Sequence, residues 1–120
     1  MKSKLFSKMS GIAICIIAFS LFGCATAGSN DSSNIKKWVS AGALIVDVRT
    51  PEEFKAENYK NSINIPVTDI EKNIKLFGDK NRLIIVYCGS GKRSGQAKDI
   101  LEKHGFNKVL DAGALPDMPK

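Results

Sequence analysis

The segment Leu83-Ile84-Ile85-Val86-Tyr87-Cys88-Gly89-Ser90-Gly91-Lys92-Arg93-Ser94 carries the strongest structural signal of the chain. Its first part, residues 83–87, is apolar and β-branched, which predicts a buried β-strand. The glycines and basic residues that follow predict a tight loop over residues 88–93, and a helix is expected from about residue 94 to residue 104. A strand that leads through a glycine-rich loop into a helix is typical of α/β proteins with a parallel sheet.

Weaker segments on both sides continue the alternation of helix and strand. We expect a helix over 33–39, a strand over 43–48, a helix from residue 50, a strand over 63–65, a helix over 68–77 and a strand over 108–110. Thr50 and Glu53 have the spacing of a helix capping box, and so do Thr68 and Glu71. The chain is therefore predicted to form an α/β domain with a mostly parallel sheet and helices on both faces. Ligands of such sheets bind at the carboxyl ends of the strands.

The first part of the chain has the pattern of an export signal. Lysines without any acidic residue precede an apolar run of 11 residues from Ile12 to Phe22, and small residues follow it. A bilayer-spanning helix needs roughly 20 apolar residues. We therefore predict a signal peptide over residues 1–23, with an uncleaved anchor as the alternative.

Two cleavage sites compete after this signal. The stretch Leu21-Phe22-Gly23-Cys24 resembles the bacterial lipobox, in which the cysteine is lipidated, whereas Ala25-Thr26-Ala27 suits ordinary signal peptidase. We favour the lipobox. The prediction is then a protein exported to the periplasm or cell envelope and attached to the membrane only by lipid on Cys24. A flexible tether over residues 24–34 would lead to the folded domain at residues 35–120.

Charge and cysteine content exclude several classes of function. The net charge of +6 falls to +3 once the three lysines of the signal, at positions 2, 4 and 8, are removed. Positive charge that is this mild and dispersed does not indicate nucleic-acid binding. Cys15 belongs to the predicted signal, and Cys24 is either lipidated or lost by cleavage. This leaves Cys88 as the one free thiol, and His104 is the one histidine. A CxxC pair and a cysteine metal cage lack a second cysteine, and zinc sites and Cys–His dyads have only His104 to draw on.

The loop that begins at Cys88 is the candidate site. Its glycines allow successive amides to point at one centre, and the helix that follows adds unpaired amides and the positive end of its dipole. Lys92 and Arg93 add full charges. In such a bowl the pKa of a thiol falls below its ordinary value of about 8.5, so Cys88 is predicted to be a nucleophile that needs no histidine base. An inert buried cysteine is the alternative.

These motifs resemble those of the rhodanese-domain family. Residues 87–94 look like its active-site loop, residues 47–54 (Asp-Val-Arg-Thr-Pro-Glu-Glu-Phe) resemble its second signature, and residues 63–66 (Ile-Asn-Ile-Pro) match the segment after it. The stretch from Ser94 to Gly113 is similar to the small periplasmic phage-shock-protein-E type. One departure stands at Asn58–Ser62, where many members of the family carry a histidine and a glycine.

The resemblance implies a sulfurtransferase that moves the sulfane sulfur of thiosulfate to cyanide or a thiol through a persulfide on Cys88. It implies a small anionic donor, a nucleophilic acceptor, no metal and no organic cofactor, and we expect a monomer. Asp47 and Arg49 match supporting positions of the family, although a structural ion pair is the simpler role for both. The residues expected to hold the substrate are Gly89, Ser90, Gly91, Lys92, Arg93 and Ser94.

Two other functions stay open at this point. Related cysteine phosphatases and arsenate reductases use a loop with five residues between cysteine and arginine, whereas four separate Cys88 from Arg93, which favours sulfur transfer. A binding module without catalysis is the second alternative, although members without activity usually lack the cysteine.

Overall fold

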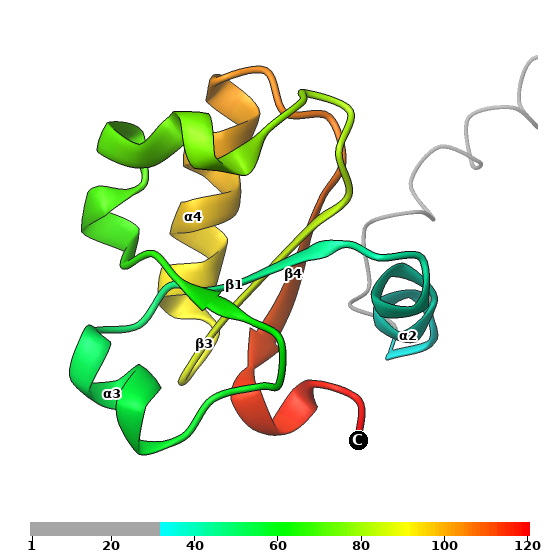
Figure 1. Cartoon of the computed structure of the whole chain (residues 1–120), viewed down its shortest axis with the longest axis vertical. Helices are drawn as coiled ribbons and strands as arrows, with labels where there is room; N and C mark the ends of the chain where they lie inside the picture. The colour runs from blue at the N-terminus through cyan, green and yellow to red at the C-terminus, as the bar shows by residue number, and fades with distance from the viewer. Residues whose placement is uncertain (1–31) are drawn as a thin grey trace, which may run out of the picture.

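Four parallel strands form the sheet at the centre of the computed structural model, which describes residues 32–120 (Figure 1). The strands are β1 (Leu44–Asp47), β2 (Ile63–Asn64), β3 (Ile84–Cys88) and β4 (Val109–Ala114). Their order in the sheet is β2-β1-β3-β4, and every neighbouring pair runs parallel. The fold class predicted from the sequence is therefore confirmed.

Strand β3 lies in the interior of the sheet and is buried along its whole length. Because side chains alternate across a strand, it contributes to two hydrophobic clusters. Val86 and Cys88 pack into the cluster of helix α4 (Lys92–Lys103), and Ile85 and Tyr87 pack into the cluster of helix α2 (Ser32–Ser40). The apolar run that dominates the sequence is thus the strand that separates the two halves of the core.

Helices cover both faces of this sheet (Figure 1). One face packs against α4 and the 3-10 helices η3 (Val67–Asp69) and η4 (Glu71–Phe77). The other face packs against α2 and η5 (Leu115–Asp117), a short helix that the sequence pattern did not predict. Helix α3 (Pro51–Ala56) directly follows β1, so it begins beside the carboxyl ends of the strands.

One of the two predicted capping boxes forms. The Thr50 side chain accepts a hydrogen bond from the Glu53 amide, and the Glu53 carboxylate accepts one from the Thr50 amide, so α3 begins as predicted. The box predicted for Thr68 and Glu71 is wrong. Thr68 lies inside η3, where it cannot take the extended backbone of a capping residue. Ile70, the residue before η4, has helical dihedral angles of φ −61° and ψ −46°, and no side chain caps that helix.

Two element boundaries also differ from the sequence prediction. Helix α4 begins at Lys92 rather than Ser94, because Gly91 adopts a left-handed conformation that turns the chain into the helix at once. Strand β4 continues to Ala114 rather than ending at Leu110, since pairing with β3 overrides the low strand propensity of its last residues.

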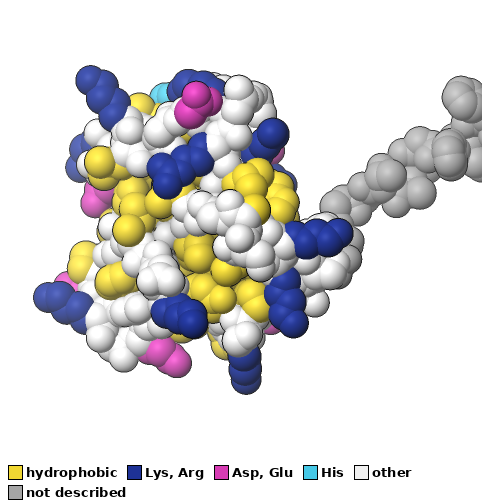
Figure 2. Space-filling model, turned by 45° about the vertical axis from the view of Figure 1, so that its right-hand side comes forward, with side chains coloured by type: hydrophobic (Ala, Val, Ile, Leu, Met, Phe, Trp, Pro, Cys, Tyr) yellow, Lys and Arg dark blue, Asp and Glu magenta, His cyan; other side chains and the backbone are white. Residues whose placement is uncertain are grey.

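The predicted signal peptide, Cys24 and the first part of the predicted tether lie outside the described residues. Residues 32–34, which close that tether, belong to α2. Within residues 32–120, no helix combines the length and apolar character that crossing a bilayer requires. Lysine and arginine side chains are scattered over the face seen in Figure 2 rather than gathered into one patch.

Candidate active site

The Cys88 side chain lies at the carboxyl end of β3 and is fully buried. Its Sγ accepts hydrogen bonds from the Gly91 amide at 2.9 Å and from the Ser94 amide at 3.4 Å. The Ser94 hydroxyl oxygen lies 3.5 Å from Sγ. The loop therefore curls around the sulfur and directs backbone N–H groups at it, the arrangement of an anion nest.

Two local features hold this curl. Gly91 has φ of 93°, a conformation that glycine adopts without strain, and a Cβ added there would lie 3.7 Å from the Cα of Gly113 on β4. Ser94 is buried, and its hydroxyl donates a hydrogen bond of 3.0 Å to the Gly91 carbonyl. The left-handed turn at Gly91 and the hydrogen bond from Ser94 thus hold the curl of the loop.

The surroundings of Cys88 change its acidity in two opposing ways. Burial raises the pKa of the thiol, because a charged sulfur loses solvation in the interior. The hydrogen bond between the Cys88 and Ser94 side chains and those from the amides of Ser94, Gly91 and Ser90 lower the pKa, and together they outweigh burial. The net pKa of Cys88 is below its ordinary value, which favours the thiolate.

Arg93 does not present a free charge to the loop. Its guanidinium donates to both carboxylate oxygens of Glu53, at 2.8 Å and 3.1 Å. The hydrogen bonds from the Arg93 side chain and from the Thr50 amide lower the pKa of Glu53 to about 2. This ion pair joins Glu53 and Arg93, which are 40 positions apart in the sequence. The capping box of α3 holds the Glu53 carboxylate in place.

The second arginine near the loop, Arg49, makes more hydrogen bonds than Arg93. The Asp47 carboxylate accepts hydrogen bonds from Nε and Nη2 of Arg49, the shortest of them 2.7 Å, and Arg49 Nη2 also donates to the Glu57 carbonyl at 2.6 Å. Its guanidinium lies 5.8 Å from the centre of the Tyr87 ring. The side-chain hydrogen bond to Asp47 raises the pKa of Arg49. The structural ion pair expected from the sequence is present.

The predicted site residues gather around one position. Gly89 and Ser90 form the exposed rim, and Lys92 is exposed on the first turn of α4. A Cβ added at Gly89 would lie 3.5 Å from Arg93 Nη2 and 3.9 Å from Arg49 Cδ, so both arginines reach the residue after Cys88. Glu53, which the sequence indicated only as a capping or ion-pair residue, belongs to this rim as well.

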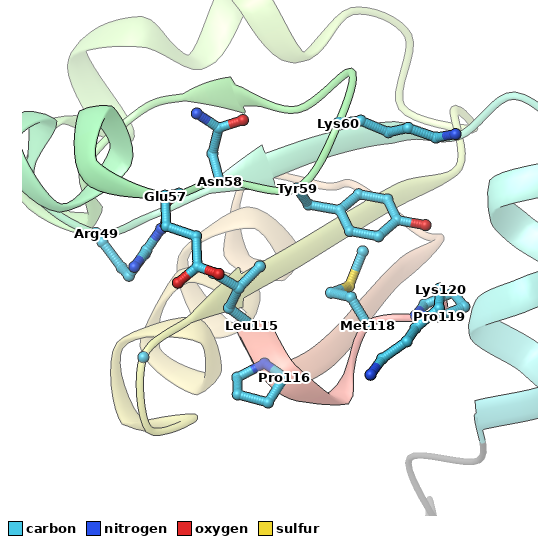
Figure 3. Close-up of a pocket in the computed structure, with 11 residues that line it drawn as sticks. Arg49, Glu57, Asn58, Tyr59, Lys60, Leu115, Pro116, Met118, Pro119 and Lys120 are labelled. Atoms are coloured by element: carbon cyan, nitrogen blue, oxygen red, sulfur yellow. The ribbon is translucent and has the colours of Figure 1, made fainter.

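A cleft of about 680 Å³ begins beside the rim at Gly89 and Arg49 (Figure 3). It was not predicted, because its walls come from distant segments, the one before β2 and the one after β4. The remaining residues that line it are Glu57, Asn58, Tyr59, Lys60, Leu115, Pro116, Met118, Pro119 and Lys120. Within residues 32–120, no group of three or more His, Cys, Asp or Glu side chains is arranged to bind a metal ion.

Comparison with curated proteins finds relatives that transfer sulfur. Thiosulfate sulfurtransferase PspE of Escherichia coli K12 is 44% identical over 78 residues, which cover 62% of this chain and 75% of that protein. Thiosulfate:glutathione sulfurtransferase of Saccharomyces cerevisiae is 33% identical over 87 residues, covering 62% of this chain and 63% of that protein.

Solved structures agree with these matches. A chain described as rhodanese with anions from E. coli has 41% sequence identity and a TM-score of 0.61, and 65% of this chain aligns with 95% of that one. The human single-domain sulfurtransferase TSTD1 has a TM-score of 0.65 at 24% identity, with 71% of this chain and 88% of that one covered, and it shares the fold. The family model of the rhodanese-like domain matches residues 31–113. Because this match spans most of the chain, the protein belongs to the rhodanese-like domain family.

Proposed function

We propose that this protein is a thiosulfate sulfurtransferase in which Cys88 carries the transferred sulfur. The observation that carries the proposal is the set of backbone amides directed at a buried Sγ, with a lowered pKa of the thiol. The relatives named as sulfurtransferases support the same reaction. No metal or organic cofactor enters the proposed chemistry.

The first half of the reaction loads the cysteine. The Cys88 thiolate attacks the outer sulfur of thiosulfate, and the bond between the two sulfurs of thiosulfate breaks. Its electron pair leaves with sulfite, and the outer sulfur stays on Cys88 as a persulfide. The amides of Gly91 and Ser94 stabilise negative charge on the sulfur throughout, because they are already oriented before the substrate arrives.

The second half of the reaction removes the sulfur from Cys88. Cyanide or a thiolate attacks the outer sulfur of the persulfide, and Cys88 leaves as a thiolate that the same amides stabilise. Arg93 is the proposed contact for the sulfonate of the donor. Since its guanidinium also binds Glu53, this contact uses donor positions that the carboxylate leaves free, or it competes with Glu53.

The cellular setting is proposed from the sequence pattern. We propose export, removal of residues 1–23, lipidation of Cys24 and a monomeric periplasmic or envelope protein. The basic start, the short apolar run and the Leu21–Cys24 motif support this setting. Intact mass of the native protein tests it, since lipidation at Cys24 and cleavage after Ala27 give chains of different mass.

Mass spectrometry with and without thiosulfate tests the reaction. Wild-type protein should gain the mass of one sulfur atom, located on the peptide that contains Cys88, and the gain should vanish on addition of cyanide. Cys88→Ser should fold normally, gain no sulfur and have no turnover. Unchanged turnover in Cys88→Ser would refute the mechanism, and a binding module would show no added sulfur in the wild type. A phosphate ester offered in parallel tests the phosphatase alternative.

A further inference from the structure

Ion pairs neutralise both arginines at the rim of the active-site loop. Asp47 binds Arg49, and Glu53 binds Arg93. Lys92, which is exposed on the first turn of α4, makes no ion pair in the described part of the chain. The rim therefore presents much less positive charge to a sulfur donor than its three basic side chains suggest.

The Glu53 carboxylate and the Arg93 guanidinium meet at the same point of the rim. A Cβ built on Gly89 would lie 3.5 Å from Arg93 Nη2 and 3.9 Å from Glu53 Oε2. Gly89 is exposed and directly follows Cys88, so a donor that reaches the sulfur lies close to both charges. Their effects on the donor largely cancel, because opposite charges at similar distances act on it in opposite directions.

Glu53 removes the net charge of Arg93 without occupying all of its hydrogen-bond donors. The carboxylate accepts one bond from Nη1 and one from Nη2, at 2.8 Å and 3.1 Å. A guanidinium has five N–H groups, two of which bind Glu53, so three stay available for the oxygens of a sulfonate. The donor can therefore bind Arg93 beside Glu53, but it then faces a neutral ion pair instead of a free cation.

The Glu53 carboxylate is ionised and held in this position. Its Oε1 accepts hydrogen bonds from the Thr50 amide at 3.2 Å and from the Thr50 hydroxyl at 3.1 Å. The pKa of Glu53 is lowered to about 2, so the carboxylate keeps its charge at neutral pH. Because 39% of the side chain is exposed, a ligand at the rim can approach this charge directly.

We propose that Glu53 is a specificity-determining residue that sets the charge of the preferred sulfur donor. By neutralising Arg93, it lowers the preference of the site for dianionic donors over monoanionic donors. The inference rests on the proposed sulfurtransferase function. Hydrogen bonds to sulfonyl oxygens serve both kinds of donor, whereas the electrostatic penalty from a nearby carboxylate doubles when the charge of the donor doubles.

Thiosulfate and methanethiosulfonate are a matched pair of donors for the test. They share the outer sulfur and two sulfonyl oxygens, and the methyl group of methanethiosulfonate replaces a charged oxygen of thiosulfate. The Cys88 thiolate attacks the outer sulfur of methanethiosulfonate, the S–S bond breaks, and its electron pair leaves with methanesulfinate. Both donors therefore leave the same persulfide on Cys88, and cyanide removes its outer sulfur as thiocyanate.

The charge preference is measured as the ratio of kcat/KM for thiosulfate to kcat/KM for methanethiosulfonate, with cyanide as the acceptor. Glu53→Gln should raise this ratio about fivefold, the worth of one exposed ion pair. Glutamine also completes a capping box, so α3 should still begin at the same residue. Glu52→Gln, which removes an exposed carboxylate from the same turn of α3, is the matched control and should leave the ratio unchanged.

Two further measurements test whether charge is the cause. The rise in Glu53→Gln should shrink at high ionic strength, because salt screens charges at the surface. Lys92→Gln, which removes the cation without a partner, should lower the ratio about twofold to fivefold. An unchanged ratio in Lys92→Gln would mean that the charge of the rim does not act on the donor, and it would overturn the proposal.

The outcome in Glu53→Gln separates this proposal from the proposed function. An unchanged ratio, or an equal rise of kcat/KM for both donors, would overturn the role of Glu53 while turnover kept the sulfurtransferase function intact. Absence of turnover with both donors in the wild type would overturn that function itself.

Discussion

Two arginines reach the rim of the Cys88 loop, and they are held in different environments. Arg49 is buried, and its partner Asp47 is fully buried. Arg93 keeps 32% of its side chain exposed, and its partner Glu53 keeps 39%. Both pairs are short, at 2.7 Å and 2.8 Å. Distance alone therefore does not distinguish a structural ion pair from one that a ligand can reach.

Burial makes the difference between the two pairs. Removal of one partner from a buried pair leaves an uncompensated charge in the interior, whereas water replaces the lost partner of an exposed pair. We therefore expect the Asp47–Arg49 pair to matter chiefly for stability and the Glu53–Arg93 pair chiefly for binding of the donor. The four predictions that follow test this division, from the largest expected effect to the smallest.

Asp47→Ala should have the largest effect. It leaves the Arg49 guanidinium buried without its counter-charge, which should lower the free energy of unfolding by about 3–5 kcal/mol. Chemical denaturation measures the loss. Asp69→Ala, which removes the exposed pair with Lys72, is the matched control and should cost less than about 1 kcal/mol. Equal losses of unfolding free energy in the two variants would show that burial does not determine how much each ion pair contributes to stability.

Arg93→Ala should act on binding rather than on stability. Loss of a charge-assisted contact to the sulfonate should raise the KM for thiosulfate about tenfold, or about 1.4 kcal/mol. The free energy of unfolding should change by less than about 1 kcal/mol, because the pair with Glu53 is partly exposed. Steady-state kinetics measure the KM for thiosulfate, with Arg82→Ala as the control variant. A large loss of stability at wild-type KM would reverse the roles assigned to the two arginines.

Thr50→Ala should produce a smaller effect on both properties. It removes the hydroxyl that caps α3 and that also donates to Glu53 at 3.1 Å. The cap is worth about 1 kcal/mol of stability, which thermal or chemical denaturation measures. The KM for thiosulfate should rise no more than about twofold, since the Thr50 amide still orients Glu53. A KM change as large as that of Arg93→Ala would mean that the cap, rather than Arg93, controls donor binding.

The pH dependence of stability should reveal the smallest effect. The pKa of Glu53 is lowered to about 2, chiefly by the hydrogen bond from Arg93, so the native state favours its ionised form. Its contribution is then fully present above the ordinary carboxyl pKa of about 4.3 and disappears as the pH falls toward 2. The difference in Tm between wild type and Glu53→Gln should therefore be greatest above about pH 5 and shrink at lower pH. A Tm difference that does not change with pH would show that the charge of Glu53 adds nothing to the stability of the protein.

Several features were predictable because neighbouring residues determine them. The buried strand, the glycine-rich loop after it and the capping box of Thr50 and Glu53 all depend on residues within one or two turns of each other. The prediction failed for Thr68, where burial of Ile70 and Phe77 accompanies two short 3-10 helices in place of one capped helix. Local spacing is a weak guide when packing decides how the chain turns.

The sequence by itself determined the parallel α/β architecture and the position of Cys88 at the end of β3, because strand periodicity and loop glycines act over short distances. Only the tertiary structure decided that Glu53 neutralises Arg93 and that residues 57–60 face residues 115–120 across a cleft. These contacts join segments about 40 to 60 residues apart along the chain. They exist because parallel strands bring their carboxyl ends to one edge of the sheet, where the loops that follow each strand meet.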